Sequence, residues 1–285
     1  MRSEKLTLGH KELLYQRLRD LKTAISEYSF ANLYLFRHSH DYEVLFDKEL
    51  FIKGKTYDKK IYLMPAFDIK NADMDYIKSV LNGADFLFPI DEAWIEPFGR
   101  EGFICSANDG DADYIYTVEK MATFKGGRLS KKRNLLKQFL ARHKPQGMPL
   151  TGDRSDDART ILEEWLKDTG LTADETDYAP ALEMLSLFDK LVLCGGIYYV
   201  DGEPAGFVMG EELDHETFAL HFAKGKKKFK GLYQYMYNDF AKLLPEKYKY
   251  FNFEQDLGKL ALKIAKSSYN PDRMLQKYRV GLKQP

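Results

Sequence analysis

The chain has 285 residues, of which 44% are apolar and 14% aromatic, and its 43 basic and 43 acidic side chains give a formal net charge of zero. This length favours two domains of ordinary size, and the apolar content excludes a largely disordered chain. A neutral chain has no overall field that would attract it to nucleic acid or to an anionic membrane surface.

The cysteine count and the hydropathy pattern narrow the class of protein further. Two cysteines, Cys105 and Cys194, are too few for a disulfide framework or a zinc site, and the histidines show no metal-ligand spacing. Neither a signal peptide nor a run of about 18 apolar residues, the length that crosses a bilayer, is visible. We therefore expect a cytoplasmic protein without a bound metal or stable membrane insertion, in which Cys194 is a buried thiol.

The first half of the chain is expected to mix short strands with helices. Apolar residues at helical spacing predict a first helix over residues 10–26, and aromatic and β-branched runs predict strands. The predicted strands cover residues 33–36, 42–46, 50–52, 60–64, 86–90 and 113–116, with a hairpin turn at 53–55 and helices at 71–81, 92–98 and 130–143. Pro145, Gly147 and Pro149 end the last helix and predict a linker, so we place a domain boundary after residue 145.

The second half has a simpler predicted order. Two helices at 155–167 and 180–190 precede strands at 196–200, 204–211 and 216–223, and then come a helix at 231–244, a strand at 248–253 and a helix at 259–266. Asp201-Gly202 joins the first two strands, and this dipeptide favours a tight hairpin. The order resembles the acetyltransferase-like (acyl-CoA N-acyltransferase) fold. We predict an α+β protein of two such lobes in tandem, residues 1–145 and 146–285, each with a mixed, mainly antiparallel sheet flanked by helices.

Two basic segments are candidates for phosphate binding. Residues 125–144 contain eight lysines and arginines and no acid, which suits a phosphate backbone or a carrier's phosphates. Five lysines between residues 224 and 230 precede Gly231, where the start of the predicted helix offers unpaired amides and the positive end of its dipole. The alternative for either segment is that its lysines and arginines only keep an exposed surface hydrated and bind no phosphate.

Acidic residues after the predicted strand at 248–253 are candidates for proton transfer. Glu254 or Asp256 can take the proton of an attacking amine or hold its ammonium group, and Tyr269 can donate to a leaving group. The same acids can instead cap the next helix or pair with Arg133 or Lys266, and Tyr269 can simply pack at a turn.

Several stretches together resemble one family, the uncharacterised bacterial proteins related to the C-terminal catalytic domain of phosphatidylglycerol lysyltransferase, which pairs two acetyltransferase-like lobes. In chain order these stretches are residues 26–33, 131–139, 230–234, 240–241, 252–258, 266–271 and 277–278. Relatives in this group move an amino acid from its tRNA onto a lipid or a peptidoglycan precursor.

The resemblance implies an acyl- or aminoacyltransferase whose acceptor amine or hydroxyl attacks an aminoacyl-tRNA or acyl-CoA directly, with no covalently bound cofactor. The alternative is a non-catalytic RNA- or anion-binding module on the same fold. The expected catalytic residues are Glu254, Asp256 and Tyr269. The expected donor- and phosphate-binding residues are Lys131, Lys132, Arg133, Asn134, Lys224, Lys230, Gly231, Tyr233, Gln234, Asn252, Lys266 and Lys277.

Overall fold

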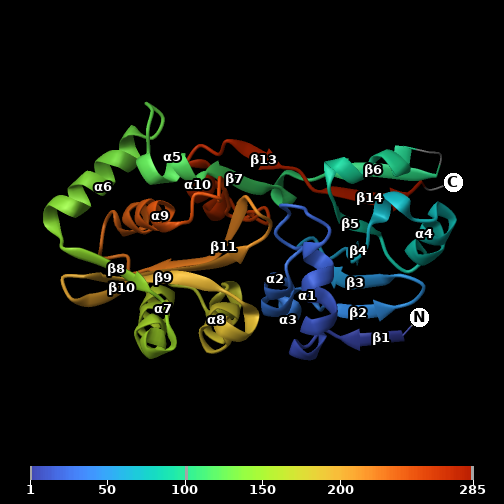
Figure 1. Ribbon diagram of the computed structural model, residues 1–285, viewed down its shortest axis with the longest axis horizontal. Helices are drawn as coiled ribbons and strands as arrows, with labels where there is room; N and C mark the ends of the chain where they lie inside the picture. The colour runs from blue at the N-terminus through green and yellow to red at the C-terminus, as the bar shows by residue number, and fades with distance from the viewer. Residues whose placement is uncertain (1, 100–101, 284–285) are drawn as a thin grey trace. The chain divides into compact units, whose positions relative to one another are not determined.

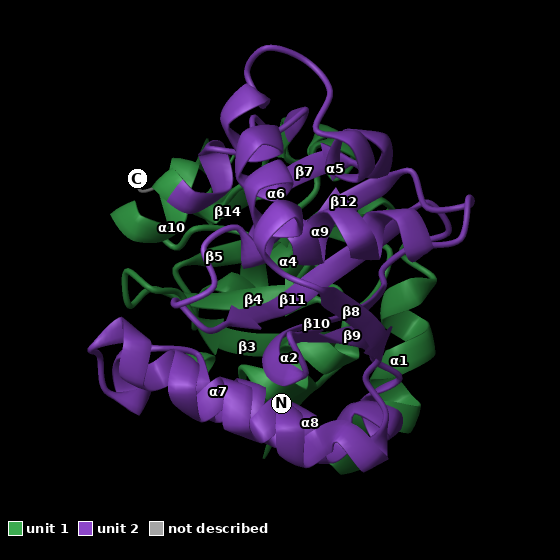
Figure 2. Cartoon of the chain, turned by 90° about the vertical axis from the view of Figure 1, so that its left-hand side faces the viewer, with its two compact units in different colours: residues 1–113, 255–264, 274–285 green, residues 114–254, 265–273 purple. Residues whose placement is uncertain are grey.

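The structure is a computed structural model that describes residues 2–99 and 102–283 (Figure 1). It divides into two compact units, which Figure 2 colours separately. Unit 1 holds the chain up to residue 113 together with residues 255–264 and the segment from 274 onward, and unit 2 holds residues 114–254 and 265–273. This division differs from the predicted boundary after residue 145.

The difference has a structural reason in each unit. The strands β7 (Asp113–Thr117) and β8 (Pro145–Pro149) belong to the sheet of unit 2, and the helices α5 (Val118–Thr123) and α6 (Ser130–Arg142) between them pack on α9 (Leu232–Leu243) of the same unit. The last strand, β14 (Tyr278–Leu282), instead returns to the sheet of unit 1. The boundary was predicted from prolines and a glycine, which show only where a helix ends. They cannot indicate that β7 pairs in the sheet of unit 2 or that β14 pairs in the sheet of unit 1.

Unit 1 is built on a seven-stranded sheet with the order β1-β2-β3-β4-β5-β14-β6. Its pairs are antiparallel except for the parallel pair β4–β5, so the predicted mixed, mainly antiparallel sheet is confirmed here. The strands are β1 (Arg2–Lys5), β2 (Glu43–Phe46), β3 (Leu50–Lys55), β4 (Ile61–Pro65), β5 (Phe86–Ile90) and β6 (Phe103–Ala107). The helices are α1 (Lys11–Arg19), α2 (Phe30–Leu35), α3 (Arg37–His40) and α4 (Met74–Leu81), with short 3-10 turns at 8–10, 69–71, 92–94, 96–99 and 109–111.

Two local predictions in unit 1 were wrong. Residues 33–36 lie in helix α2 or directly after it and form no strand, because the Ser29 side chain accepts a hydrogen bond from the Asn32 amide and starts a helix there. Gly54 lies inside β3 and not in a turn. A Cβ atom at Gly54 would come within 2.6 Å of the Tyr42 ring and 2.8 Å of the Tyr62 ring, so the glycine lets two tyrosines pack on the strand.

Unit 2 contains a second seven-stranded sheet, with the order β13-β7-β12-β11-β10-β9-β8. The pair β11–β12 is parallel, and the pairs β7–β12, β10–β11, β9–β10 and β8–β9 are antiparallel. The helices α7 (Ser155–Thr169) and α8 (Tyr178–Leu191) cover one face, and α9 covers the other with α5 and α6 against it (Figure 1). The strands are β9 (Cys194–Val200), β10 (Glu203–Glu212), β11 (Thr217–Gly225), β12 (Tyr250–Asn252) and β13 (Arg273–Leu275), and α10 (Leu260–Ser267) contains residues of both units.

In unit 2 the structure confirms the predicted hairpin but differs from the predictions for the linker and for Cys194. The hairpin at Asp201-Gly202 is confirmed, and both residues have positive φ, 53° and 84°. The predicted linker forms the strand β8 at the sheet's edge, where a proline costs no ladder hydrogen bond on the open side. Cys194 is exposed on β9 and is not the buried thiol that we predicted. Among residues 2–99 and 102–283, no helix combines the length and apolarity needed to span a membrane.

Gly231 supports a prediction about how α6 and α9 pack. Gly231 precedes α9 with a φ of 101°, and an added Cβ atom would lie 2.8 Å from both the Leu135 carbonyl oxygen and the Phe139 Cβ of α6. We expect Gly231→Ala to lower the free energy of unfolding by about 1–3 kcal/mol, because the backbone and the space both require glycine. Urea unfolding measures this loss. Gly127→Ala is the control, since a Cβ atom there meets nothing within 4 Å, and equal stability of the two variants would contradict the packing argument.

Candidate functional site

A β-bulge in β11 is the central feature of the site in unit 2. On β10, Met209 pairs with Phe222 and Gly210 pairs with Leu220, so His221 is an extra residue in β11. Bulges redirect a side chain and occur often beside active sites. The parallel pairing of β11 with β12 ends at Ala219 and Asn252, two residues before the bulge. His221 therefore lies where the chain continues beyond the paired part of β12.

His221 joins two acidic side chains into what we call the His221 cluster, Glu211, His221 and Glu254. Its Nδ1 atom lies 2.7 Å from Glu254 Oε1, and its Nε2 atom lies 2.9 Å from Glu211 Oε1. The His221 side chain is fully buried, whereas Glu211 is 5% exposed and Glu254 is 14% exposed. Burial alone lowers the pKa of His221, but the two carboxylates outweigh it and raise this pKa to about 10. The ring is thus an imidazolium at neutral pH and donates to both acids.

The backbone of Glu254 is held in an uncommon conformation by two residues that we expected to bind phosphate. Glu254 has a φ of 59°, which is rare outside glycine. Its amide donates to Asn252 Oδ1 at 2.6 Å, and its carbonyl oxygen accepts from Lys266 Nζ at 3.2 Å. Asn252 is fully buried. Asn252 and Lys266 therefore stabilise the backbone conformation of Glu254.

The lysines at the end of β11 and in the loop that follows it divide into paired and exposed residues. Lys224 is buried, with its Nζ atom 2.5 Å from Asp177 Oδ1 and 3.8 Å from the centre of the Trp165 ring, and burial lowers its pKa although Asp177 opposes the shift. Lys226 is buried too and pairs with two acids of unit 2. Lys230 is exposed. Lys227 and Lys228 are exposed as well, and Lys228 pairs with Glu203, so Lys227 and Lys230 are placed to meet a ligand in solution.

The start of α9 meets the start of α6 through Tyr269. Gln234 Nε2 donates to the Tyr269 hydroxyl at 2.7 Å, and Lys132 Nζ lies 3.8 Å from the centre of the Tyr269 ring. Burial raises the pKa of the Tyr269 phenol above its usual range, and burial lowers the pKa of Lys132. Tyr233 accepts a hydrogen bond from the Gly225 amide at 3.1 Å. The structure thus brings together Lys132, Gln234 and Tyr269 at the start of α9.

The remaining residues of the predicted basic helix have separate roles. The Arg133 guanidinium donates to the carbonyl oxygens of Phe124 and Gly126, at 2.5 and 3.1 Å, and so closes the loop between α5 and α6. Lys131 and Asn134 are exposed on α6. Arg133 is therefore a structural residue, while its two neighbours are accessible to a partner.

Two of the predicted site residues, Asp256 and Lys277, belong to unit 1. Asp256 is 2% exposed, and its Oδ1 atom accepts a hydrogen bond from the Gly258 amide at 2.8 Å. Lys277 is fully buried, with its Nζ atom 2.6 Å from both Glu27 Oε2 and Asp113 Oδ1. A lysine enclosed in this way cannot reach a carrier's phosphate in this structure.

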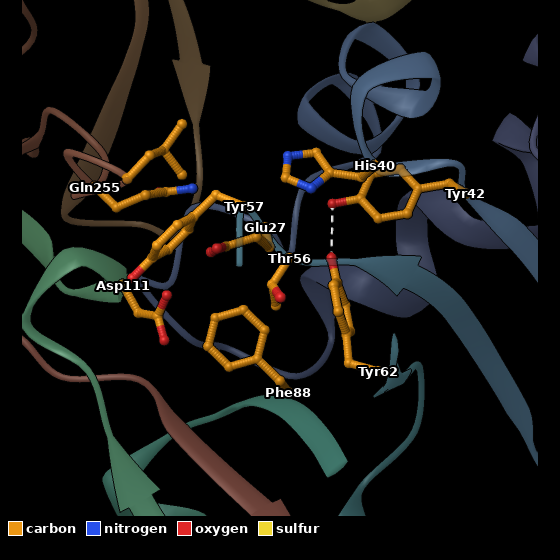
Figure 3. Close-up of a pocket in the computed structure, with 10 residues that line it drawn as sticks. Glu27, His40, Tyr42, Thr56, Tyr57, Tyr62, Phe88, Asp111 and Gln255 are labelled. Carbon is orange, nitrogen blue, oxygen red and sulfur yellow. Dashed lines mark hydrogen bonds between the residues drawn. The ribbon is translucent and has the colours of Figure 1, made fainter. Parts of the chain in front are cut away.

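A small pocket in unit 1 is lined in part by Glu27 and Gln255 (Figure 3), both of which contact Lys277. Its volume is about 10 Å³, about the space that one water molecule needs. Burial raises the pKa of Glu27 to about 7, although the charge of Lys277 opposes this shift. The lining residues are Glu27, His40, Tyr42, Thr56, Tyr57, Tyr62, Phe88, Asp111, Gln255 and Leu257.

Sequence reasoning missed Glu27 and His221 as functional candidates. Glu27 lies in the stretch 26–33 that carried the family resemblance, so that stretch was the available signal. The spacing of the histidines gave no reason to single out His221, because a bulge leaves no mark in the residue pattern. Within the described part of the chain, no group of three or more His, Cys, Asp and Glu side chains could hold a metal ion.

Comparison with known proteins places the chain in a family. The family model described as "Phosphatidylglycerol lysyltransferase, C-terminal" matches residues 18–281. The chain belongs to this family. A match to an uncharacterized protein of Mycoplasmoides gallisepticum, 22% identical over 180 residues, covers 61% of this chain, which spans 57% of the length of that curated relative.

Solved structures resemble the whole chain of this family member. A conserved protein of unknown function from Bacteroides thetaiotaomicron is 28% identical, with a TM-score of 0.83, over 99% of this chain and all of that one. The C-terminal domain of a candidate lysylphosphatidylglycerol synthetase from Agrobacterium fabrum is 14% identical, with a TM-score of 0.61, over 98% of this chain and 92% of that one. L-PGS from Bacillus licheniformis is 15% identical, with a TM-score of 0.53, over 86% of this chain and 85% of that one. With the two mixed sheets and their flanking helices, these likenesses confirm the predicted tandem acetyltransferase-like fold.

The buried position of Lys277 leads to a prediction about stability. Lys277→Met leaves the buried acids Glu27 and Asp113 without their cation, so we expect the free energy of unfolding to fall by about 3–5 kcal/mol. Adding Glu27→Gln should change this loss little, because without the ammonium the raised pKa of Glu27 keeps its carboxyl group protonated at pH 7. Urea unfolding at pH 7 measures both variants, and the exposed Lys283→Met is the matched control. If Lys277→Met were as stable as Lys283→Met, Lys277 would not be a structural residue.

Proposed function

We propose that this protein transfers an aminoacyl group from an aminoacyl-tRNA to an amine or hydroxyl acceptor. The match of residues 18–281 to the phosphatidylglycerol lysyltransferase C-terminal family carries the proposal. The groups around the β11 bulge and the start of α9 supply chemistry that such a transfer needs. A base beside the acceptor and a cationic surface for the donor are the two essential parts.

The proposed donor surface is formed by α6 and the loop before it. Exposed cations follow one another along this segment, and residues 125–144 contain no acid that would offset them. Such a surface binds the phosphates of RNA without reading its sequence, which suits a donor recognised partly by its backbone. The exposed basic residues are Lys125, Arg128, Lys131, Lys137, Arg142 and Lys144.

Glu254 is the proposed base. As the acceptor nitrogen or oxygen forms its bond to the ester carbonyl carbon, Glu254 takes the proton that the acceptor loses. The bond between the carbonyl carbon and the ribose oxygen then breaks, and that oxygen must receive a proton to leave as a hydroxyl. Tyr269 is the proposed donor of this proton, because Gln234 already donates to its oxygen. Atoms and charges balance without a covalent enzyme intermediate.

The proposed base leads to a prediction about catalysis. Glu254→Gln keeps the shape of the side chain but removes its basicity, so we expect the rate of product formation to fall by about 10²–10⁴-fold with unchanged tRNA binding. The assay follows radiolabelled amino acids from total charged tRNA into phosphatidylglycerol vesicles and, in parallel, into a lysine-containing peptide. The exposed Glu246→Gln is the control. An unchanged rate in Glu254→Gln would remove Glu254 from the mechanism. The same two acceptors, with radiolabelled acyl-CoA in place of the charged tRNA, test an acyl-CoA donor.

The donor surface leads to a second prediction, about binding. Lys131→Glu with Lys137→Glu should weaken tRNA binding and reduce the slope of log affinity against log salt by about 2, one unit for each lost phosphate contact. Filter binding at several salt concentrations measures this. Lys167→Glu with Lys190→Glu on α7 and α8 is the control with the same change of charge. Equal weakening in both pairs would show that α6 has no special part. Salt-sensitive tRNA binding without any product would favour the binding-module alternative.

A further inference from the structure

The His221 cluster spans three neighbouring strands of the unit 2 sheet. Glu211 lies on β10, His221 lies at the bulge of β11, and Glu254 follows β12 by two residues. Because a bulge adds one residue, it changes the direction of the side chain at that point. In this case the redirected imidazole reaches an acid on each side, at 2.9 and 2.7 Å.

The two hydrogen bonds have the geometry of an imidazolium placed between two carboxylates. A neutral imidazole has one N–H group and can donate to one carboxylate, whereas an imidazolium donates to two. Glu254 is the more exposed of the two acids, at 14% against 5%, so it is the end at which a proton from outside the cluster would arrive.

The Glu254 backbone adds an independent observation. Its φ of 59° is maintained by Asn252 and Lys266, which bind its amide and its carbonyl oxygen. A non-glycine residue in this region stores strain, and such strain concentrates at functional sites. Side chain and backbone of Glu254 are thus both fixed by neighbours, which is how a preorganised base is held.

We infer that His221 and Glu211 are positioning residues for Glu254: the imidazolium orients the Glu254 carboxylate, and Glu211 holds the imidazolium in place. This inference rests on the proposed function, in which Glu254 accepts the acceptor's proton. The His221 side chain itself is fully buried, so it acts through Glu254 and not by direct contact with a substrate. A buried ion pair with a purely structural role is the competing explanation.

A double-mutant cycle distinguishes positioning from a structural role. We expect His221→Gln to lower kcat by 10- to 100-fold with KM changed by less than twofold. In a Glu254→Gln background the same change should have no further effect on kcat, since His221 acts only through Glu254. Equal loss in both backgrounds, or an unchanged kcat in His221→Gln, would overturn the inference. The assay is the transfer from charged tRNA described above, with urea unfolding of each variant.

Glu211→Gln keeps the inference testable if His221→Gln fails to fold. It removes the charge that holds the imidazolium but keeps an oxygen acceptor, so kcat should fall and Glu211→Asp should recover part of the loss. Recovery of stability without recovery of kcat would overturn the inference. The failure of the proposed function is recognised separately, because the unaltered protein would then form no product from any charged tRNA. An active protein with an unaffected Glu254→Gln variant would refute the base, and the positioning role with it.

Discussion

A charge that is removed from water needs an opposite charge at hydrogen-bond distance, and this constraint organises both units. In unit 1 the buried Lys277 ammonium contacts Glu27 and Asp113 at 2.6 Å each and Gln255 at 3.0 Å. These four residues come from segments of the sequence that are far apart, and removing the lysine would leave two buried acids unpaired. The network therefore specifies which segments belong to unit 1, including the returning C-terminal segment. In unit 2 His221 does the same between Glu211 and Glu254.

Positive residues that look alike in the sequence have different roles in this protein. Lys224, Lys277 and Arg133 are bound by acids or carbonyl oxygens of the protein. Lys131 and Lys230 are exposed. The difference follows from what packs around each residue, because a lysine inside a fold must satisfy its charge locally and one on a surface is hydrated. The candidate donor surface is thus smaller than the basic pattern of the chain suggests, and it lies on α6 and the loops on either side of this helix.

The features that could be predicted from the sequence are those fixed by neighbouring residues. The helix at 130–143, which ends before Pro145, the Asp201-Gly202 hairpin and the helix that begins after Gly231 are of this kind, and the structure confirms them. Residues 33–36 were assigned wrongly because the hydrogen bond that the Asn32 amide donates to the Ser29 side chain starts a helix, against the β preference of the residues that follow.

The candidate site was less predictable because its members meet only after folding. Glu254 was named from its place after a strand, but its partner His221 is separated from it by 33 positions and depends on a bulge. Lys277 and Glu27 are 250 positions apart, so no local pattern could indicate that Lys277 is enclosed. Charge and spacing alone could indicate which residue types are suited to the chemistry. They could not indicate which of these residues are buried and paired with other side chains of the fold.

The buried position of Glu27 makes the stability of the folded protein depend on the pH of the solution. Because the pKa of Glu27 in the folded protein is about 7, and an unburied glutamic acid has a pKa near 4.3, the folded protein keeps a proton there that the unfolded chain has lost. This group's contribution to stability therefore decreases as the pH rises between these two values. The Lys277 ammonium opposes this uptake of a proton, so losing that cation would raise the pKa of Glu27 further.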